Sequence, residues 1–358
     1  CRGLGGLLLL FRGGLGPLLC SAGAISLLVL GLLAAVRLPV AAQGAQELEA
    51  LPTGVAGELL LLRGRAPGAC LAVALDRAKA ESRGSFRFFE ADMDARLHER
   101  RRLEQDLRDA VEAEAFEVHY QPIYDFGTER IGGFEALLRW THPERGRVSP
   151  AEFIPLAEEI GLIARLGEWV LRQACAEAAG WPDDLKIAVN VSAVQFSSAT
   201  LPTAVHEALA RSGLPGHRLE LEITESVLVA NPRATTEILH GLKRLGVRVS
   251  MDDFGTGYSS LSYLRRIAFD KIKIDQSFVR DLPHERSGAA IVRAIVDLAT
   301  GLDMTITAEG VETEAQRLCL LHQGCHEFQG YLFSKPVPAL EAGILAAKRD
   351  LPERPHAA

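Results

Sequence analysis

The feature that most constrains this chain is a repeated apolar strand that ends in a polar side chain. Seven short segments in the last two-thirds of the 358 residues each combine an apolar run with a carboxylate, a carboxamide or a lysine. The segments are Phe134–Arg139, Ile187–Asn190, Leu219–Glu222, Val247–Asp253, Ile272–Asp275, Thr305–Glu309 and His326–Gln329. Their polar ends are separated by roughly the length of a strand plus a helix. This rhythm predicts a barrel of alternating strands and helices, with functional groups at the carboxyl ends of the strands.

The intervening sequence has the matching helix and strand patterns. Phe116–Phe126 and Ile131–Trp140 read as paired strands joined by a turn at residues 125–128. The remaining expected strands are Lys186–Val191, Arg218–Ile223, Val247–Met251, Lys271–Ile274 and Met304–Ala308, and the expected helices are Pro150–Glu159, Ala164–Ala179, Pro202–Ser212, Pro232–Leu245, Gly288–Leu302 and Glu314–His322. Helices between strands require parallel neighbours, so the sheet is closed or doubly wound. Together with the apolar segment His326–Gln329, these are eight strand candidates, which favour an α/β fold with a closed, TIM-like (β/α)8 barrel.

Composition and the polar strand ends together narrow the class of ligand. Hydrophobic residues make up 48% of the chain, which is enough for a large core, and 39 basic against 46 acidic residues give a net charge of −7. A broad nucleic-acid-binding face is therefore not expected, and no nucleic acid polymer is expected as a partner. Acids with one asparagine suit hard cations, and phosphate is a common substrate of such sites. The sequence predicts a metal-dependent phosphoryl-transfer enzyme.

The first 70 residues differ in composition from the rest. Gly, Leu and Ala dominate, no acid precedes Glu47, and residues 18–36 carry no charge. That uncharged stretch is long enough to cross a bilayer and is a candidate inner-membrane attachment. Because Arg2 and Arg12 precede it, the positive-inside rule would place the catalytic part outside the cytoplasm, which conflicts with a cytosolic substrate. The alternative is that residues 1–70 are an artefact of a misread or truncated gene.

Three further segments and the cysteines complete the domain map. Residues 71–91 read as a short helix and strand, residues 92–115 as a linker helix, residues 116–350 as the barrel and residues 351–358 as a tail. The six cysteines form no C-x-x-C pair. Cys319 and Cys325 lie near His322 and His326, which allows zinc, but scattered core thiols are the better interpretation.

The motifs at the strand ends resemble those of the EAL family of cyclic di-GMP phosphodiesterases. The similarity runs from Tyr120-Gln121-Pro122 to the segment 329–336, in the family's order and spacing. Between them lie Glu135-Ala136-Leu137-Leu138-Arg139-Trp140, Asn190-Val191-Ser192, Glu222-Ile223-Thr224-Glu225-Ser226, Asp252-Asp253-Phe254-Gly255-Thr256-Gly257, Lys273-Ile274-Asp275 and Ala308-Glu309-Gly310-Val311-Glu312. The resemblance implies a barrel whose first strand is antiparallel. Residues 71–91 also resemble the end of a GGDEF domain, but the Gly-Gly-Asp-Glu-Phe signature is absent, so cyclase activity is not expected.

The resemblance implies two Mg²⁺ or Mn²⁺ ions in each active site. One ion would be held by Glu135, Asn190, Glu222 and Asp252. The second would be held by Asp252 and Asp253, with Glu309 reaching it directly or through water. Helix caps or surface charge could account for one or two of these acids, but not for five at strand ends. We expect Ca²⁺ to inhibit, because its longer and looser coordination fits a tight two-metal geometry poorly.

Lys273, Glu309 and Asp252 are the expected catalytic residues. Strand alternation between Ile272 and Ile274 points Lys273 into the barrel with the acids, where a lysine must be paired. The resemblance implies that Lys273 contacts the attacking water and phosphate. A purely structural ion pair with Asp275 or Glu309 is the alternative, and the sequence does not decide whether Lys273 or Glu309 is the principal base.

The remaining site residues are also implied by the resemblance. Glu225 would position the glycine-rich loop that begins at Asp253, although as a bare residue it could equally cap a helix. The expected substrate-binding residues are Gln121, Leu137, Arg139, Asp275, Glu312 and Gln329. The implied activity is hydrolysis of cyclic di-GMP to linear pGpG by a homodimer with a cytoplasmic catalytic domain. The alternative is a catalytically weak EAL domain that acts as a cyclic di-GMP receptor.

Overall fold

The computed structural model describes residues 91–198, 200–227, 232–256, 264, 267–284 and 286–349. The candidate membrane span at 18–36, the segment 71–90 and the tail at 351–358 lie outside these residues. Within the described part, no helix has the length and apolar character needed to cross a membrane. Residues from His98 onward form one compact unit, to which the following description applies.

Eight strands close into a barrel. They are β1 (Glu117–Asp125), β2 (Arg130–His142), β4 (Lys186–Asn190), β5 (Leu219–Thr224), β6 (Arg248–Phe254), β7 (Lys271–Ile274), β8 (Thr305–Ala308) and β9 (Glu327–Phe328). Neighbouring strands from β2 to β9 are parallel in chain order, and β1 is antiparallel to both β2 and β9. The predicted closed barrel and its antiparallel first strand are therefore confirmed. Short strands β3 (Gly146–Val148) and β10 (Val337–Pro338) extend β2 and β1.

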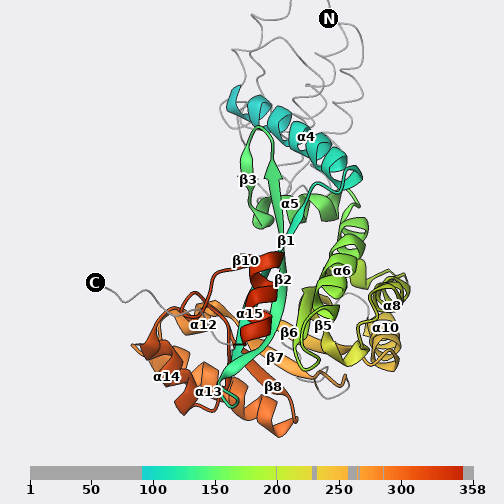
Figure 1. The fold of residues 1–358 in the computed structure, drawn as a ribbon. Helices are drawn as coiled ribbons and strands as arrows, with labels where there is room; N and C mark the ends of the chain where they lie inside the picture. Colours follow the sequence, from blue (N-terminus) through green and yellow to red (C-terminus); the bar gives the residue numbers. More distant parts are fainter. Residues whose placement is uncertain are drawn as a thin grey trace, which may run out of the picture. The chain divides into compact units, whose positions relative to one another are not determined.

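Helices fill most of the connections between the strands, and in the chain one helix precedes β1 and another follows β10 (Figure 1). They are α4 (Ala91–Glu112), α5 (Pro150–Glu159), α6 (Ile163–Ala179), α7 (Ala193–Phe196), α8 (Leu201–Ser212), α10 (Pro232–Arg244), α12 (Gln276–Arg280), α13 (Arg286–Gly301), α14 (Glu314–His322) and α15 (Ala339–Lys348), with a 3-10 turn at Gly216–Arg218. Helices α5, α6, α8, α10, α13 and α14 begin and end within two residues of their predicted positions. Helix α4 ends three residues before the predicted end of the linker helix, and α15 had no predicted counterpart. The short helices α7 and α12 were not predicted, because four or five residues are too few to show a helical period.

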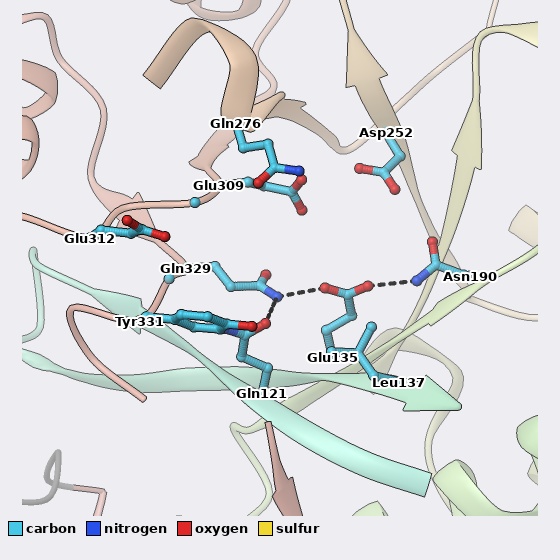
Figure 2. Close-up of a pocket in the computed structure, with 12 residues that line it drawn as sticks. Gln121, Glu135, Leu137, Asn190, Asp252, Gln276, Glu309, Glu312, Gln329 and Tyr331 are labelled. Carbon is cyan, nitrogen blue, oxygen red and sulfur yellow. Dashed lines mark hydrogen bonds between the residues drawn. The ribbon is translucent and has the colours of Figure 1, made fainter. Parts of the chain in front are cut away.

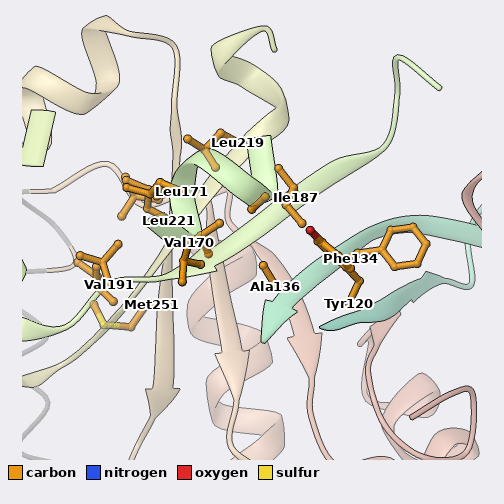
Figure 3. Packing of buried hydrophobic residues seen from close by; sticks show 14 of the residues in the cluster. Tyr120, Phe134, Ala136, Val170, Leu171, Ile187, Val191, Leu219, Leu221 and Met251 are labelled. Carbon is orange, nitrogen blue, oxygen red and sulfur yellow. The ribbon is translucent and has the colours of Figure 1, made fainter. Parts of the chain in front are cut away.

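The hydrophobic core lies between the outer face of the strands and the surrounding helices. Figure 3 shows Val170 and Leu171 of α6 beside Ile187 and Leu221, which belong to β4 and β5. These four side chains are all buried. Alternation along each strand sends these apolar residues outward to the helices, so the residues between them point into the barrel. That inner face carries the charged groups described next.

Candidate active site

A cavity of about 320 Å³ opens at the carboxyl ends of the strands. It is lined by Gln121, Glu135, Leu137, Asn190, Asp252, Gln276, Glu309, Gly310, Glu312, Gln329, Gly330 and Tyr331. In Figure 2 the carboxylates of Glu135, Asp252 and Glu309 and the amide of Asn190 surround one space. These groups come from four different strands or strand ends. Functional side chains thus converge at the mouth where the sequence predicted them.

Lys273 lies beneath this cavity and is the centre of its charge network. Its side chain is 1% exposed, and Nζ lies 2.7 Å from Glu222 Oε2 and 2.5 Å from Glu309 Oε1. Asp252 Oδ1 is 3.2 Å from the same nitrogen, and Glu135 Oε2 is 3.6 Å from it. The predicted inward direction of Lys273 is confirmed. The ion pair with Glu309 is present, whereas the Asp275 carboxylate accepts a bond from the backbone N–H of Ser277 instead.

Amide side chains fix the Glu135 carboxylate on both sides (Figure 2). Asn190 Nδ2 donates to Glu135 Oε1 at 2.6 Å, and Gln329 Nε2 donates to Oε2 at 2.6 Å. Gln329 Nε2 also donates to Gln121 Oε1 at 3.0 Å, and Gln121 Nε2 donates to the carbonyl of Ser334. The chain of amides links β1, β2, β4 and the residue after β9. It holds Glu135 in one orientation beside Lys273.

The pKa values of the carboxyl groups in this site are shifted in different directions. Burial opposes ionisation of Glu135, but Lys273 and the bonds from Gln329 and Asn190 outweigh it and hold the pKa below its ordinary value. Burial raises the pKa of Glu222 well above normal, and repulsion by neighbouring acids adds to it against the attraction of Lys273. Burial and the same kind of repulsion raise the pKa of Glu309 to about 8. Burial, then Asp252 and Asp275, raise the pKa of Asp253 to about 6. The site therefore has more acid than Lys273 can neutralise.

This excess of carboxylate fits divalent cations. Oxygen atoms of Asp252, Asp253 and Glu309 lie within 4.8 Å of one another, the only such cluster of potential ligands among the described residues. Glu222 Oε1 is buried and has no hydrogen-bond partner in the described part of the chain. Buried carboxylates that repel each other and an orphaned carboxylate oxygen are the donor set that Mg²⁺ or Mn²⁺ would satisfy. The cysteine and histidine residues near 319–326 form no such cluster among the described residues, which favours the core-thiol interpretation.

The turn after β6 is tied to the strand beside it. Gly255 donates its backbone N–H to Glu225 Oε1 at 2.8 Å. Thr256 Oγ1 donates to the carbonyl of Asp253 at 2.8 Å. The bond from Gly255 to Glu225 supports the loop-positioning role expected of Glu225 over a role as a simple helix cap. Most of the glycine-rich loop beyond Thr256 lies outside the described residues.

The structure separates the expected substrate-binding residues into two groups. Gln121, Leu137, Glu312 and Gln329 line the cavity, whereas Arg139 and Asp275 do not. The Arg139 guanidinium donates to the neighbouring carbonyl of Leu138, and Asp275 caps α12. Sequence reasoning missed two lining side chains, Gln276 and Tyr331. Gln276 directly follows the Lys273-Ile274-Asp275 motif, and Tyr331 follows Gln329-Gly330. Their position next to these motifs was the one sequence feature that could have placed them at the cavity.

A second buried charge cluster, which we call the lower layer, is formed by Lys271, Glu220 and Glu327. Lys271 lies two residues before Lys273 on β7, so it occupies the preceding inward-facing position of that strand. Lys271 Nζ is 2.9 Å from Glu220 Oε1 and 2.9 Å from Glu327 Oε2. Arg248 Nε lies 3.4 Å from Glu220 Oε2, and Thr307 Oγ1 donates to Glu327 Oε2 at 2.7 Å. Burial disfavours the Lys271 ammonium, but the two glutamates outweigh it and raise the pKa of Lys271. Burial likewise opposes ionisation of Glu327, yet Lys271 outweighs it and lowers the pKa of that carboxyl.

Comparisons with known proteins agree on one family and fold. The family model for the EAL domain matches residues 104–336. MucR of Pseudomonas aeruginosa, a bifunctional diguanylate cyclase/cyclic di-GMP phosphodiesterase, is 46% identical over 270 residues, which are 74% of this chain and 39% of MucR. The cyclic di-GMP phosphodiesterase PdeR of Escherichia coli is 41% identical over 270 residues, 75% of this chain and 41% of PdeR.

A solved structure extends this likeness to three dimensions. The PaMucR phosphodiesterase in its complex with cyclic di-GMP superimposes with a TM-score of 0.65 at 46% identity. The superposition covers 67% of this chain and 99% of that chain. The present chain therefore matches nearly the whole of that solved chain, although it spans only 39% of MucR and 41% of PdeR.

Proposed function

The chain belongs to the EAL domain family, and we propose that it is a metal-dependent phosphodiesterase that hydrolyses cyclic di-GMP to linear pGpG. The observation that carries this proposal is the set of carboxylates around Lys273 at the mouth of the barrel. The named activities of MucR and PdeR support the substrate. Hydrolysis would lower the concentration of this second messenger in the bacterial cytoplasm, where we expect the catalytic domain to act.

Two cation sites are proposed within this set. Glu135, Asn190, Glu222 and Asp252 would hold one Mg²⁺ or Mn²⁺ ion, and Asp252, Asp253 and Glu309 the other. Bound there, the ions would activate water and stabilise the leaving oxygen of an in-line displacement. The protein's own part is to hold the ligands. The amides of Asn190 and Gln329 fix Glu135, and Glu225 fixes the turn that bears Asp253.

The reaction converts one phosphodiester into a terminal phosphate. Water adds to one phosphorus atom while the bond from that phosphorus to the 3′ oxygen breaks. Lys273 lies beneath the cavity, where its ammonium would stabilise the negative charge on the reacting phosphate. Glu309 is the proposed acceptor of the water's proton. Lys273 is a poorer candidate, because the surrounding acids outweigh the effect of burial, raise its pKa and keep it as an ammonium without a free lone pair.

The rest of the cavity suits a nucleotide ligand. Gln121 and Gln329 offer amide groups to phosphate oxygens or guanine edges, and Leu137 adds an apolar contact. Glu312 can accept hydrogen bonds from guanine N–H groups. Arg139 and Asp275 do not line the cavity, so their proposed contact with substrate requires a change of side-chain orientation. A homodimer is proposed as the working assembly.

The test is to incubate the full 358-residue chain with cyclic di-GMP and separate the products by chromatography. We expect pGpG with Mg²⁺ or Mn²⁺, and inhibition by Ca²⁺, whose looser coordination suits the site less well. Glu135→Ala, which removes a ligand, should form no pGpG. Near-normal turnover in that variant would contradict the proposed metal site, and turnover with Ca²⁺ equal to that with Mg²⁺ would contradict the geometric argument.

Tight binding of cyclic di-GMP without turnover would reassign the chain to the receptor class. Equilibrium dialysis of the same preparation distinguishes this outcome from a protein that does not bind. The carboxylates around Lys273 favour the enzyme, because a receptor that needs no cation gains nothing from mutually repelling buried acids.

A further inference from the structure

The turn that carries Asp253 has an unfavourable backbone conformation. Asp253 has a φ of 51° and Gly255 a φ of 95°. Glycine tolerates such angles, but a residue with a side chain loses free energy in the left-handed region. A conformation of this kind persists only where the surrounding structure holds it, and such residues cluster at functional sites. The contacts that hold this turn therefore also fix the Asp253 carboxylate beside Asp252 and Glu309.

Two of these contacts are polar. Glu225 Oε1 accepts from the backbone N–H of Gly255, and the carbonyl of Asp253 accepts from Thr256 Oγ1. Both bonds act on the backbone of the turn. Neither bond involves α12, the helix that follows the strand bearing Lys273.

A third contact is apolar and comes from Phe278 of α12. A β-carbon added to Gly255 would lie 3.1 Å from Cε2 and 3.3 Å from Cζ of the Phe278 ring. The ring therefore packs directly on the Cα atom of Gly255. Ile295 of α13 borders the same spot, with Cδ1 at 3.8 Å from the added carbon.

Phe278 is itself fixed by the neighbouring helix. A β-carbon on Gly288, near the start of α13, would lie 3.3 Å from the carbonyl oxygen of Phe278. The side chain is half-buried and packs against the hydrophobic core. Two residues earlier, Gln276 of α12 reaches into the cavity beside Glu309 (Figure 2). Phe278 thus lies between the packed helices α12 and α13 and the turn that bears Asp253.

We propose that Phe278 is a positioning residue for the second cation site, the one formed by Asp252, Asp253 and Glu309. Its ring seats the turn at Gly255 so that Asp253 keeps its left-handed conformation and its carboxylate stays in the cluster. The first cation site shares Asp252 with the second, but its other three ligands, Glu135, Asn190 and Glu222, come from β2, β4 and β5 rather than from this turn. Loss of the ring therefore affects the second site selectively. This inference rests on the proposed function, because it assumes that both sites bind cations.

The test is a Mn²⁺ titration of the full 358-residue chain, with free Mn²⁺ followed by electron paramagnetic resonance. The parent chain is expected to bind two ions. Phe278→Ala should keep one site at parent affinity and lose about 10- to 100-fold in affinity at the other, as is usual when a residue supporting a ligand is removed. Phe278→Leu, which restores an apolar contact, should recover part of the loss. Cyclic di-GMP turnover should require correspondingly more Mn²⁺ in Phe278→Ala.

Phe126→Ala is the matched control. Phe126 is also a half-buried phenylalanine, but it follows β1 and packs beneath the guanidinium of Arg317, 4.9 Å from the ring centroid. Its truncation removes the same atoms from a position remote from the cation ligands. This variant should keep both Mn²⁺ sites, and melting temperatures of both alanine variants show whether each is folded.

The outcomes separate this inference from the proposed function. Two Mn²⁺ sites of parent affinity in Phe278→Ala would overturn the inference alone. Equal weakening of both sites, or the same loss in Phe126→Ala, would also overturn it, because the effect would then be general. A folded parent chain that binds fewer than two ions would overturn the two-cation proposal and this inference with it.

Discussion

Two layers of buried charge inside the same barrel have opposite character. In the upper layer, around Lys273, the ammonium faces Glu135, Glu222, Asp252 and Glu309. In the lower layer, Lys271 faces Glu220 and Glu327. Strands β5 and β7 supply both layers, because Glu220 and Glu222, like Lys271 and Lys273, are two residues apart and point the same way.

The difference between the layers is the balance of charge. Lys271 and Arg248 match Glu220 and Glu327, and the shifts in the pKa values of Lys271 and Glu327 favour their charged forms. In the upper layer, the pKa values of Glu222 and Glu309 are raised, so burial and mutual repulsion oppose ionisation. Buried charges that neutralise one another need no further partner and are structural. Buried carboxylates in excess of the nearby cationic side chains are instead stabilised when divalent cations bind. The following substitutions test that distinction.

The largest effect is expected from Lys273→Met. Removal of the ammonium takes away the charge that faces the reacting phosphate, and we expect cyclic di-GMP hydrolysis to fall by about 100- to 1,000-fold. Initial rates at saturating Mg²⁺ measure the loss. Because a cation can replace part of the missing charge, Mn²⁺ should raise the melting temperature of this variant more than that of the parent. Turnover close to that of the parent would remove Lys273 from the mechanism.

The same substitution in the lower layer, Lys271→Met, should reduce the stability of the fold rather than turnover. It leaves Glu220 and Glu327 buried without their partner, which should lower the free energy of unfolding by about 3–5 kcal/mol. Urea denaturation measures this loss, and Mn²⁺ should not reverse it. Turnover per folded molecule should remain that of the parent. A variant with unchanged stability but lost turnover would show that the lower layer is not merely structural.

A smaller effect is expected from pH on the upper layer. Folding raises the pKa of Glu309 from 4.5 to about 8 and that of Asp253 from 3.8 to about 6. The folded state then holds protons that the unfolded state has lost, so the stability of the metal-free protein falls as pH rises through this range. Cations bind the ionised carboxylates, so Mn²⁺ affinity should rise by about tenfold or more between pH 6 and pH 8. Thermal shifts with Mn²⁺ at both values test this, and equal shifts would contradict the acid excess.

The smallest effect is expected when the whole lower layer is made apolar. A buried ion-pair network can often be replaced by hydrophobic residues of similar volume at little cost. The triple variant Glu220→Leu, Lys271→Met, Glu327→Leu should therefore lie within about 1 kcal/mol of the parent in its free energy of unfolding. It should also keep parental turnover. A loss as large as that of Lys271→Met alone would mean that the charges contribute more than their mutual neutralisation.

The sequence predicted the barrel and the ring of acids because both depend on local periodicity. Alternation around Ile272 and Ile274 was enough to direct Lys273 inward, and the structure agrees. The same alternation also directs Lys271 inward, but its partners Glu220 and Glu327 lie on strands that only the tertiary fold brings near. The lower layer could not be recognised as a network from sequence alone.

Side-chain orientation and short helices set the other limits. Arg139 was expected at the substrate, but its guanidinium bonds to a carbonyl of its own strand, a choice between rotamers that periodicity does not determine. Helix α12 has five residues, so neither Gln276 in the cavity nor Phe278 against Gly255 could be assigned in advance. These contacts depend on how a short helix packs after a strand, which is a tertiary property.

Anomalous diffraction from crystals of this chain soaked in Mn²⁺ tests the central claim most directly. We expect two anomalous peaks about 4 Å apart among the carboxylates of the upper layer, with Asp252 between them. No peak should appear near Lys271, where the charges already match. An upper layer without Mn²⁺ at saturating concentration, or a peak in the lower layer, would contradict the account.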